Sequence, residues 1–500
     1  MSVRRVLVIG SGPAGAMVAH QLVARGIPVT MMESGQTPPQ GLLLRLLDRN
    51  IVRRLPPAER IANPEQGRGR GALWIRHMSH GGLTNQWTGA VPRFAPEDFS
   101  DGVRLHERYR WPIGYDDLTS YYQIAERLIG VSGQSGDLPI LPGGHIAHPR
   151  RLPADWQPVA RQAAAQGQGL APIPIADGSP NMLVRRGTAF NSYSVIVEPL
   201  LASPHFTLLA GAHALELEWS PSESRVRSVV YHDRNDGQEK RLEAAAVVVA
   251  CGPLHSTKLL LNSRSADFPN GLGNSEGLLG RHLHDHVRDW WSVELETPIT
   301  LLNSAAYLTR RPFATSAPLV STSWTLGVAS TKDRIRSRAS LKSTTVGVQV
   351  FGTTIPDERN FVRLSGAQRD EFGRPELDIQ MKFDDGDVQN VVDARQTFLD
   401  LLRASGYNAS LKETPTVLTA GEGVHFGGTI RMHASRQYGV VDAWNRLYDA
   451  PNVVACDASC FTTGPEKNPT LTAMAIAARA ADRLAHDLKQ HAIPASGASR

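Results

Sequence analysis

The chain has 500 residues, which is too long for one small core. Of these residues 41% are hydrophobic and 20% are charged, a composition typical of globular proteins. Its net charge of +5 is small for this length and comes without a run of Lys or Arg, which argues against nucleic-acid binding. No apolar run approaches the roughly 18 residues that span a bilayer, and three cysteines in no metal-binding spacing argue against a disulfide framework.

The Arg4–Arg5 pair is a feature found in export signals. A structured motif begins directly behind it and leaves no room for a cleavable segment. We therefore expect a cytoplasmic protein, and the sequence leaves its oligomeric state open.

The first predicted unit is a buried strand, Val6–Ile9, followed by a glycine-rich turn and a helix over residues 14–24. A second strand over residues 28–32 then ends at Glu33. This order of strand, glycine turn, helix, strand and acid is that of a dinucleotide-binding unit.

Each part of this unit has a mechanical role. Gly10 permits the tight turn, Gly12 lets the backbone approach a pyrophosphate, and Gly15 lets the helix pack on the strand. The helix start offers free N–H groups to phosphates, and Glu33 can accept hydrogen bonds from ribose hydroxyls. The unit predicts a dinucleotide site but leaves NAD and FAD both open.

A loop with a glycine pair follows this unit. Residues 63–72 are rich in turn-forming residues and are predicted to be an exposed connection. Gly81 and Gly82 then occur within residues 77–89, where they would let the backbone pass close to a flat ligand.

The next segment is less regular. We expect a helix over residues 117–129, capped by Asp116 or Asp117. Residues 136–155 are rich in Pro, Gly and His and are predicted to be a surface excursion.

A second group of strands begins at residue 206. The last strand of this group is continuously apolar, ends at Cys251–Gly252 and enters a helix near residues 258–261, which favours a parallel sheet approached by a ligand. The predicted strands cover residues 206–209, 214–219, 226–232 and 244–250.

The pattern changes between residues 287 and 383. Apolar and polar residues alternate over 377–383, and residues 316–325 and 343–351 are rich in β-branched residues. We predict a separate, largely antiparallel sheet inserted into the nucleotide-binding part of the chain. A helix over residues 388–403 leads back, and residues 492–500 are expected to be disordered.

His425 and Asn468 are the candidate catalytic pair. Oxidation of an alcohol by hydride transfer requires a base at the hydroxyl and an orienting partner, while a cofactor takes the hydride. A histidine with a pKa of about 6.5 titrates around neutrality, and an asparagine offers a donor and an acceptor without charge. Pro469 suits the first turn of a helix that runs to about Lys489.

Several blocks in a fixed order along the chain identify a family. They are the glycine turn with Glu33, the Gly81–Gly82 loop, Trp111–Pro112, residues 248–252, residues 280–286 and the two segments around His425 and Asn468. With these blocks the chain resembles the glucose–methanol–choline oxidoreductases nearly end to end, and most of all the pyranose oxidase branch. The resemblance implies an FAD-binding flavoprotein that oxidises a CH–OH group.

The resemblance also implies a domain division. The fold expected is α/β, with an FAD-binding Rossmann-like domain of parallel sheet and helices and an inserted substrate domain with a largely antiparallel sheet. The FAD domain would be discontinuous over residues 1–100, 180–286 and 425–490. Residues 101–179 would form a connecting segment, and residues 287–424 the substrate domain.

The family pattern assigns roles to single residues. His425 and Asn468 match the His–Asn pair of pyranose oxidases, 43 residues apart, with the positive end of the following helix at the flavin pyrimidine edge. Thr88 matches a threonine beside flavin N5, and Asp457 matches the acid that binds the ribityl chain. The full set expected to bind FAD is Gly10, Gly12, Gly15, Glu33, Gly81, Gly82, Asn85, Thr88, Cys251, Gly252, Asp457, Pro469 and Thr470.

The chain departs from the pyranose oxidases at one position. Gln86 stands where they carry a histidine covalently attached to FAD, so we predict non-covalent FAD, with His80 as a weak alternative attachment point. The cluster His282, His284 and His286 suggests a metal at first sight. The resemblance instead implies that Asp285–His286 is a structural turn near the cofactor, so no metal is predicted, and His433 is expected to be structural.

The predicted reaction is the oxidation of a secondary CH–OH of a pyranose sugar or glycoside to a ketone, with oxygen or another electron acceptor reoxidising the flavin. Gln349 and Thr353 are the candidate substrate-binding residues. The alternative is that they are polar only because one face of an antiparallel sheet is exposed to water. Three alternatives remain: the same chemistry on a non-sugar natural-product alcohol, a redox-neutral FAD-containing lyase, and an NAD-dependent enzyme that uses only the first site.

Overall fold

The computed structural model describes residues 5–35, 59–62, 73–85, 87–134, 136–137, 141–176, 190–297, 299, 306–309, 322–327, 343–412, 416–417 and 419–490. The predicted exposed connection over 63–72, the predicted disordered end over 492–500 and Gln86 all lie outside these ranges.

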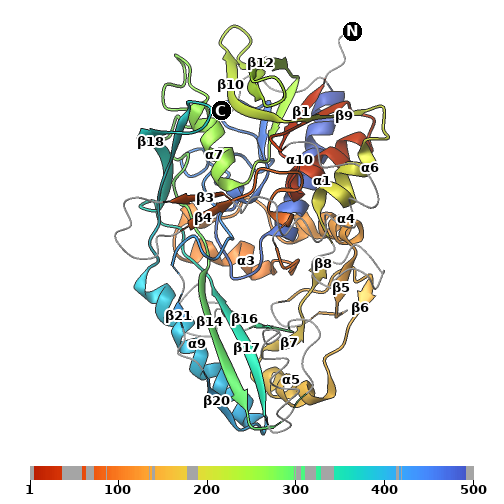
Figure 1. The fold of residues 1–500 in the computed structure, drawn as a ribbon, viewed down its shortest axis with the longest axis vertical. Coiled ribbons are helices and arrows are strands. Elements are labelled where there is room, and N and C mark those ends of the chain that lie inside the picture. Colours follow the sequence, from red (N-terminus) through yellow and green to blue (C-terminus); the bar gives the residue numbers. More distant parts are fainter. Residues whose placement is uncertain are drawn as a thin grey trace.

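A five-stranded parallel sheet occupies the upper part of Figure 1, in the order β22-β13-β1-β2-β9. Helices α1 (Pro13–Val23) and α10 (Thr470–Lys489) pack on one another and share one hydrophobic core with the sheet. The prediction of a parallel sheet with helices is confirmed. Its strands are β1 (Val6–Ile9), β2 (Val29–Glu33), β9 (Phe206–Ala210), β13 (Ala246–Val249) and β22 (Val453–Ala455).

The second strand group divides between two sheets. Its outer strands β9 and β13 join the parallel sheet, whereas β10 (Ala212–Ser220), β11 (Arg225–Asp233) and β12 (Gln238–Glu243) form an antiparallel sheet of their own. The charged, largely exposed strand β12 has no apolar pattern and was not predicted. Helix α7 (Pro253–Asn262) begins directly after Gly252, earlier than expected.

The predicted cap of the helix near residue 117 is wrong. A 3-10 turn covers residues 116–118, and α4 (Thr119–Ile129) begins behind it with Leu118 as its N-cap. The Asp117 carboxylate accepts instead from the Gly114 N–H at 2.8 Å. The side chain of an aspartate before a helix can accept a hydrogen bond from the helix backbone or from the backbone of a preceding turn. Here it accepts from the preceding turn.

A seven-stranded antiparallel sheet fills the lower part of Figure 1, in the order β20-β14-β17-β16-β15-β7, with β21 also paired to β14. This confirms the predicted antiparallel sheet, but its edge strand β7 comes from the segment expected to be only a connection. The strands are β7 (Gly169–Pro172), β14 (Val287–Leu295), β15 (Ala306–Thr309), β16 (Thr322–Gly327), β17 (Thr344–Gly352), β20 (Ala409–Leu411) and β21 (Thr416–Val417).

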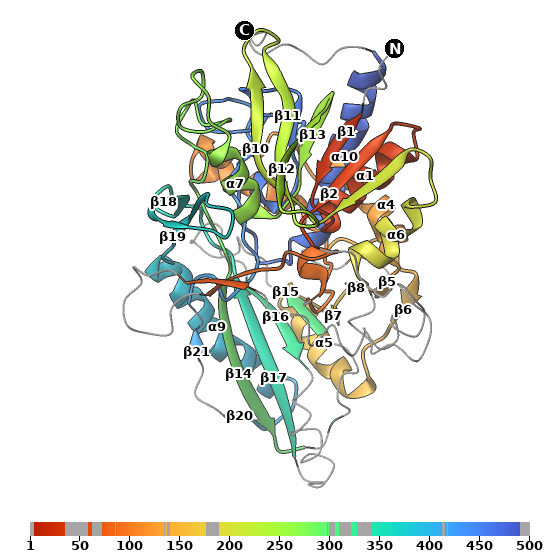
Figure 2. The same ribbon diagram turned by 45° about the horizontal axis from the view of Figure 1, so that its top comes forward.

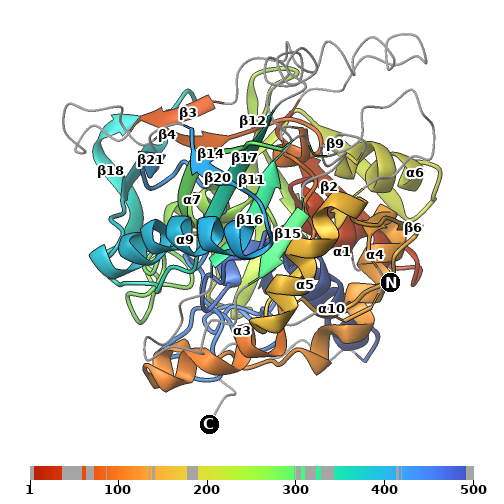
Figure 3. The same ribbon diagram turned by 90° about the horizontal axis from the view of Figure 1, so that it is seen from below.

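Helix α9 (Asp385–Ala404) covers one face of this sheet, with α5 (Gln157–Ala165) beside it (Figure 3). On that face Trp291 and Val293 of β14 are buried, and the buried Asp289 carboxylate pairs with Arg395 of α9 at 2.5 Å. Because side chains alternate along a strand, Arg288 and Trp290 lie on the opposite face.

The predicted strand over residues 377–383 forms β19 (Pro375–Gln380), which pairs only with β18 (Phe361–Arg369) as a separate hairpin. Figure 2 shows this hairpin beside α7, with which it is in contact. No helix among the described residues is long and apolar enough to cross a membrane. The remaining elements are β3 (Glu59–Ala62), β4 (Leu73–Arg76), β5 (Val131–Gly133), β6 (His148–Pro149), β8 (Ile175–Ala176), α3 (Pro96–Ser100) and α6 (Glu198–Leu200).

Candidate functional site

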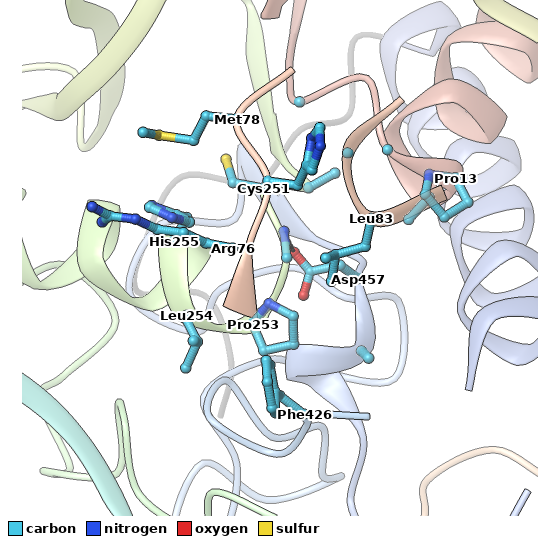
Figure 4. A pocket seen from close by; sticks show the side chains of 18 of the residues that line it. Pro13, Arg76, Met78, Leu83, Cys251, Pro253, Leu254, His255, Phe426 and Asp457 are labelled. Atoms are coloured by element: carbon cyan, nitrogen blue, oxygen red, sulfur yellow. Dashed lines mark hydrogen bonds between the residues drawn. The ribbon is translucent and has the colours of Figure 1, made fainter. Parts of the chain in front are cut away.

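A cavity of about 440 Å³ is lined by residues of the parallel sheet, the antiparallel sheet and the loops between them. Figure 4 shows part of its wall, with Arg76 and His255 at one end and Pro13 at the other. Gly15, Gly81, Asn85 and Thr353 do not line it. The site residues predicted from the sequence that do line it are Gly10, Gly12, Glu33, Gly82, Thr88, Cys251, Gly252, Gln349, His425, Asp457, Asn468, Pro469 and Thr470.

Bare glycine backbone forms one end of the cavity. Gly10 has φ +101°, and a Cβ there would lie 2.5 Å from the Ala250 carbonyl oxygen, so the turn requires glycine. A Cβ on Gly12 or Gly252 would meet no atom within 4 Å, because both face open space. Gly12 also precedes the first turn of α1, whose free N–H groups attract anions. This cradle fits the pyrophosphate of a dinucleotide such as FAD.

Glu33 braces the same turn while facing the cavity. Its Oε2 accepts from the Ser11 N–H at 3.1 Å and from the Ser11 hydroxyl at 2.5 Å, and its Oε1 accepts from the Gly35 N–H at 2.8 Å. A carboxylate has about four acceptor positions. The carboxylate therefore keeps capacity for a ribose hydroxyl, and its position is fixed in advance.

Asn85 acts on the loop rather than on the cavity. Its Nδ2 donates to the Ser79 hydroxyl, the His80 carbonyl and the Gly82 carbonyl at 2.8–3.1 Å. The Gly81 N–H donates to the Ser11 hydroxyl at 2.9 Å. The Asn85 bonds hold the shape of the glycine-pair loop, and the Gly81–Ser11 bond ties this loop to the glycine turn.

Asp457 joins two further segments. Its Oδ2 accepts from the Gly252 N–H at 3.0 Å and the Ser256 hydroxyl at 2.5 Å, and its Oδ1 accepts from the Ser459 N–H at 2.8 Å. Burial raises the pKa of Asp457. Burial also raises the pKa of the Cys251 thiol, which makes this cysteine a wall residue rather than a nucleophile.

The structure brings His425 and Asn468 together at the wall of the same cavity. Asn468 Nδ2 lies 3.1 Å from His425 Nε2, and His425 Nδ1 lies 3.1 Å from His286 Nδ1. An amide nitrogen only donates, so His425 Nε2 accepts, and the proton of the neutral ring resides on Nδ1 and is donated to His286. His286 in turn bonds to the Pro465 backbone. This chain of bonds leaves the Nε2 lone pair of His425 directed toward Asn468.

The protonation state of His425 follows from its surroundings. Burial lowers its pKa well below the usual value, and the nearby His286 and Arg288 lower it further. Burial also lowers the pKa of His286 to about 4. Both rings are therefore neutral near pH 7, and Nε2 of His425 is unprotonated and able to take up a proton.

The buried Asp285 carboxylate holds the loop that carries His425. It accepts from the N–H groups of Gly421 and Gly423 at 3.0 Å and of His425 at 2.9 Å. Burial raises its pKa to about 6, against the effect of these bonds. Val424, directly before His425, has φ +59°, which is strained for a β-branched residue. The expected structural turn at Asp285 thus directly contacts the loop that carries His425.

A buried ion cluster fixes the segment before Asn468. The Lys467 ammonium lies 2.9 Å from the Asp98 carboxylate and 2.7 Å from that of Glu466. Pro469 and Thr470 follow, so the N-terminal end of α10 points into the cavity and offers its positive dipole there.

Arg288 and Phe351 are cavity residues that were not predicted. With its amide oriented to satisfy both groups, Gln349 accepts through its side-chain oxygen from the Arg288 guanidinium, which also lies over the Phe351 ring at 5.8 Å. The alternation of residues 288–291 along a strand was the sequence signal that could have placed Arg288 on the cavity face.

The other histidines singled out in the sequence, His80, His282, His284, His286 and His433, do not line the cavity. His80 packs edge-on against Tyr193, and His433 bonds to the backbone of Glu107 and Ser435. His284 is buried against Gly427 and Gly464, whereas His286 faces His425. The two rings therefore do not face a common point. Within the described ranges no group of three or more His, Cys, Asp or Glu side chains is arranged to hold a metal ion.

Comparison with known proteins identifies the family. Family models described as GMC oxidoreductase match residues 111–288 and 356–477. The chain is 31% identical to 6'''-hydroxyparomomycin C oxidase of Streptomyces lividus, over 96% of this chain and 93% of the relative. It is 26% identical to C-glycoside 3-oxidase of Microbacterium trichothecenolyticum, over 97% and 96%.

A solved structure shows the same fold. Pyridoxine 4-oxidase from Mesorbium loti superposes with a TM-score of 0.69 at 20% identity, covering 97% of this chain and 99% of that one. The chain therefore belongs to the GMC oxidoreductase family and is an FAD-dependent oxidoreductase that acts on CH–OH donors.

Proposed function

We propose that the protein oxidises a secondary CH–OH of a pyranose sugar or glycoside to a ketone, with His425 as the base. The observation that carries this proposal is the pair of His425 and Asn468 at the cavity, in which Nε2 of His425 is unprotonated. Bound FAD supplies the hydride acceptor. Residues 1–100, 180–286 and 425–490 would hold the cofactor, and residues 287–424 the substrate.

His425 Nε2 takes the hydroxyl proton as the carbinol hydrogen leaves as hydride, so the alcohol loses two electrons and two hydrogens and becomes a ketone. Asn468 orients the hydroxyl through its amide without adding charge. His286 accepts from the Nδ1–H of His425, so the imidazolium formed keeps a hydrogen-bond partner. The N-terminal end of α10 stabilises negative charge that arises at this end of the cavity.

A His425→Ala variant tests the role of the base. We expect it to bind FAD to the same content as the wild type but to be reduced by substrate at least about 100-fold more slowly under anaerobic conditions, because general-base catalysis contributes on that order. An absorption spectrum gives the FAD content, and stopped-flow bleaching gives the rate. Reduction at the wild-type rate would remove His425 from the mechanism.

We propose that FAD is bound non-covalently. Support comes from the glutamine at position 86 and from His80, which does not line the cavity. Acid or heat should release the flavin from the denatured chain, and a flavin that stays with the precipitate would contradict the proposal.

A natural-product alcohol is a second candidate substrate, because the relative with 31% identity is an oxidase of 6'''-hydroxyparomomycin C. A panel of free sugars, simple glycosides and glycosylated natural products, with peroxide measured under air, separates the two substrates. The same panel shows whether oxygen reoxidises the flavin. Thr88, which lines the cavity and matches the threonine that the family has beside flavin N5, would influence that step.

A further inference from the structure

One face of strands β14 and β17 carries four large side chains beside the catalytic pair. Arg288 is directly opposite Phe351 in the register, and Trp290 is directly opposite Gln349. Partners opposite each other across two strands share a face of the sheet, as do residues two apart on one strand. Arg288, Gln349 and Phe351 line the cavity that contains His425.

The positive charge of Arg288 has no carboxylate partner among the described residues. Its Nη1 donates to the Glu422 carbonyl at 3.1 Å, and the rest of its guanidinium faces Gln349 and Phe351. By contrast, the buried Arg93 forms a salt bridge to Glu126 at 2.6 Å. Burying a guanidinium without a countercharge costs free energy.

The two acids that act to raise the pKa of Arg288, Asp285 and Glu422, have their carboxylates hydrogen-bonded elsewhere. The Asp285 carboxylate accepts from the backbone of the loop carrying His425, and Glu422 Oε2 accepts from the N–H and hydroxyl of Thr419. Burial accordingly lowers the pKa of Arg288 despite both acids. The guanidinium also retains donor capacity, since only part of its five N–H groups is used.

Trp290 extends this face toward solvent. It is 44% exposed, one of three exposed large hydrophobic residues in the described part of the chain. It is two residues from Arg288, which corresponds to about 7 Å along a strand. An exposed indole presents a flat apolar surface on which the carbon face of a sugar ring can stack.

We infer that the sugar substrate carries an anionic oxygen group, a carboxylate or a phosphate, that binds Arg288 while a neighbouring ring packs on Trp290. A planar guanidinium held by Gln349 presents paired N–H groups that match either anion. This inference deepens the proposed function and rests on it. It places a uronic acid or sugar phosphate, rather than a neutral or cationic sugar, in front of His425.

Binding is measured by calorimetry on the FAD-loaded His425→Ala protein, which holds the probe without turnover. The probes are methyl glucuronide, methyl glucoside 6-phosphate and methyl glucoside. We expect at least one anionic probe to bind about 10- to 100-fold more tightly than methyl glucoside, the range for a charged hydrogen bond. The preference should weaken in high salt, and the tighter probe identifies the anion.

Two further variants locate the effect. Arg288→Gln in the same background should abolish the preference, whereas Trp290→Ala should leave it unchanged, because these single-ring probes carry no neighbouring ring to pack on the indole. Equal binding of charged and neutral probes by the parent overturns the inference. An Arg288→Gln variant that keeps the preference but shifts the FAD reduction potential would assign the arginine to the flavin and also overturn it.

The inference and the proposed function fail in different ways. If methyl glucoside reduces the FAD of the wild type rapidly and anionic probes are not preferred over it, the inference is wrong and sugar oxidation is supported. If no probe reduces the FAD but anionic probes bind more tightly and Arg288→Gln abolishes that preference, the proposal of sugar oxidation is wrong. Arg288 is then an anion site for another substrate.

Discussion

Replacing His286 by asparagine or glutamine tests how His425 is kept unprotonated at Nε2. Asparagine places its side-chain oxygen where His286 Nδ1 accepts from His425 at 3.1 Å. Glutamine reaches the position of the other ring nitrogen, near Pro465, but leaves the Nδ1–H of His425 without an acceptor. The two variants therefore separate the hydrogen bond from the mere bulk of the ring.

The size of the effect follows from that one bond. A buried donor without a partner costs about 1–3 kcal/mol, which favours the tautomer with the proton on Nε2, where Asn468 can rotate its amide to accept it. A cost of about 1.4–2.8 kcal/mol in forming the active tautomer lowers the rate of flavin reduction roughly 10- to 100-fold. We expect this loss for His286→Gln, and a loss of no more than about threefold for His286→Asn.

Two measurements check the prediction. Anaerobic stopped-flow gives the reduction rate across pH with a saturating substrate, and ¹⁵N spectra of histidine-labelled, FAD-loaded protein report which ring nitrogen of His425 is protonated. FAD content and melting temperature control for misfolding. A glutamine variant with wild-type rates and an Nδ1-protonated His425 would refute the role assigned to His286.

Two further predictions concern stability. Asp285→Asn should lower the free energy of unfolding by about 1–3 kcal/mol, measured by denaturant titration, because only one of the two amide groups can accept and a buried backbone N–H is left unpaired; an unchanged midpoint would contradict the anchoring role. Acid should also destabilise the protein, because burial lowers the pKa of His284 to about 3 and of His286 to about 4, and that of His425 well below 6.5. The unfolded chain takes up these protons near pH 6.5, so the stability is complete above that pH and falls by about 1.4 kcal/mol per pH unit for each histidine toward pH 4. Asp285, with its pKa raised to about 6, offsets part of this loss. Melting temperatures at pH 7.5 and 5.5 measure the difference, and equal values would count against neutral buried rings.

Local patterns were sufficient for much of the fold. The strand at Val6–Ile9 and the helices α1, α9 and α10 were predicted within a few residues, because apolar periodicity and the special backbone of glycine and proline act over short distances. The same locality explains the errors. The strand β12 has no apolar pattern, and the edge strand β7 gains its place only by pairing with β15, more than a hundred residues later.

The sequence by itself determined the dinucleotide unit, the order of parallel and antiparallel sheets, and the pair His425 and Asn468 as candidates. The tertiary structure decided what those candidates can do. Asp285 holds a loop some 140 residues away, and His286 fixes the position of the proton on His425. Arg288 faces the cavity with no carboxylate partner in the part of the chain that the structure describes. Proton position and charge balance depend on atoms brought within about 3 Å by packing, and distance along the chain does not encode such contacts.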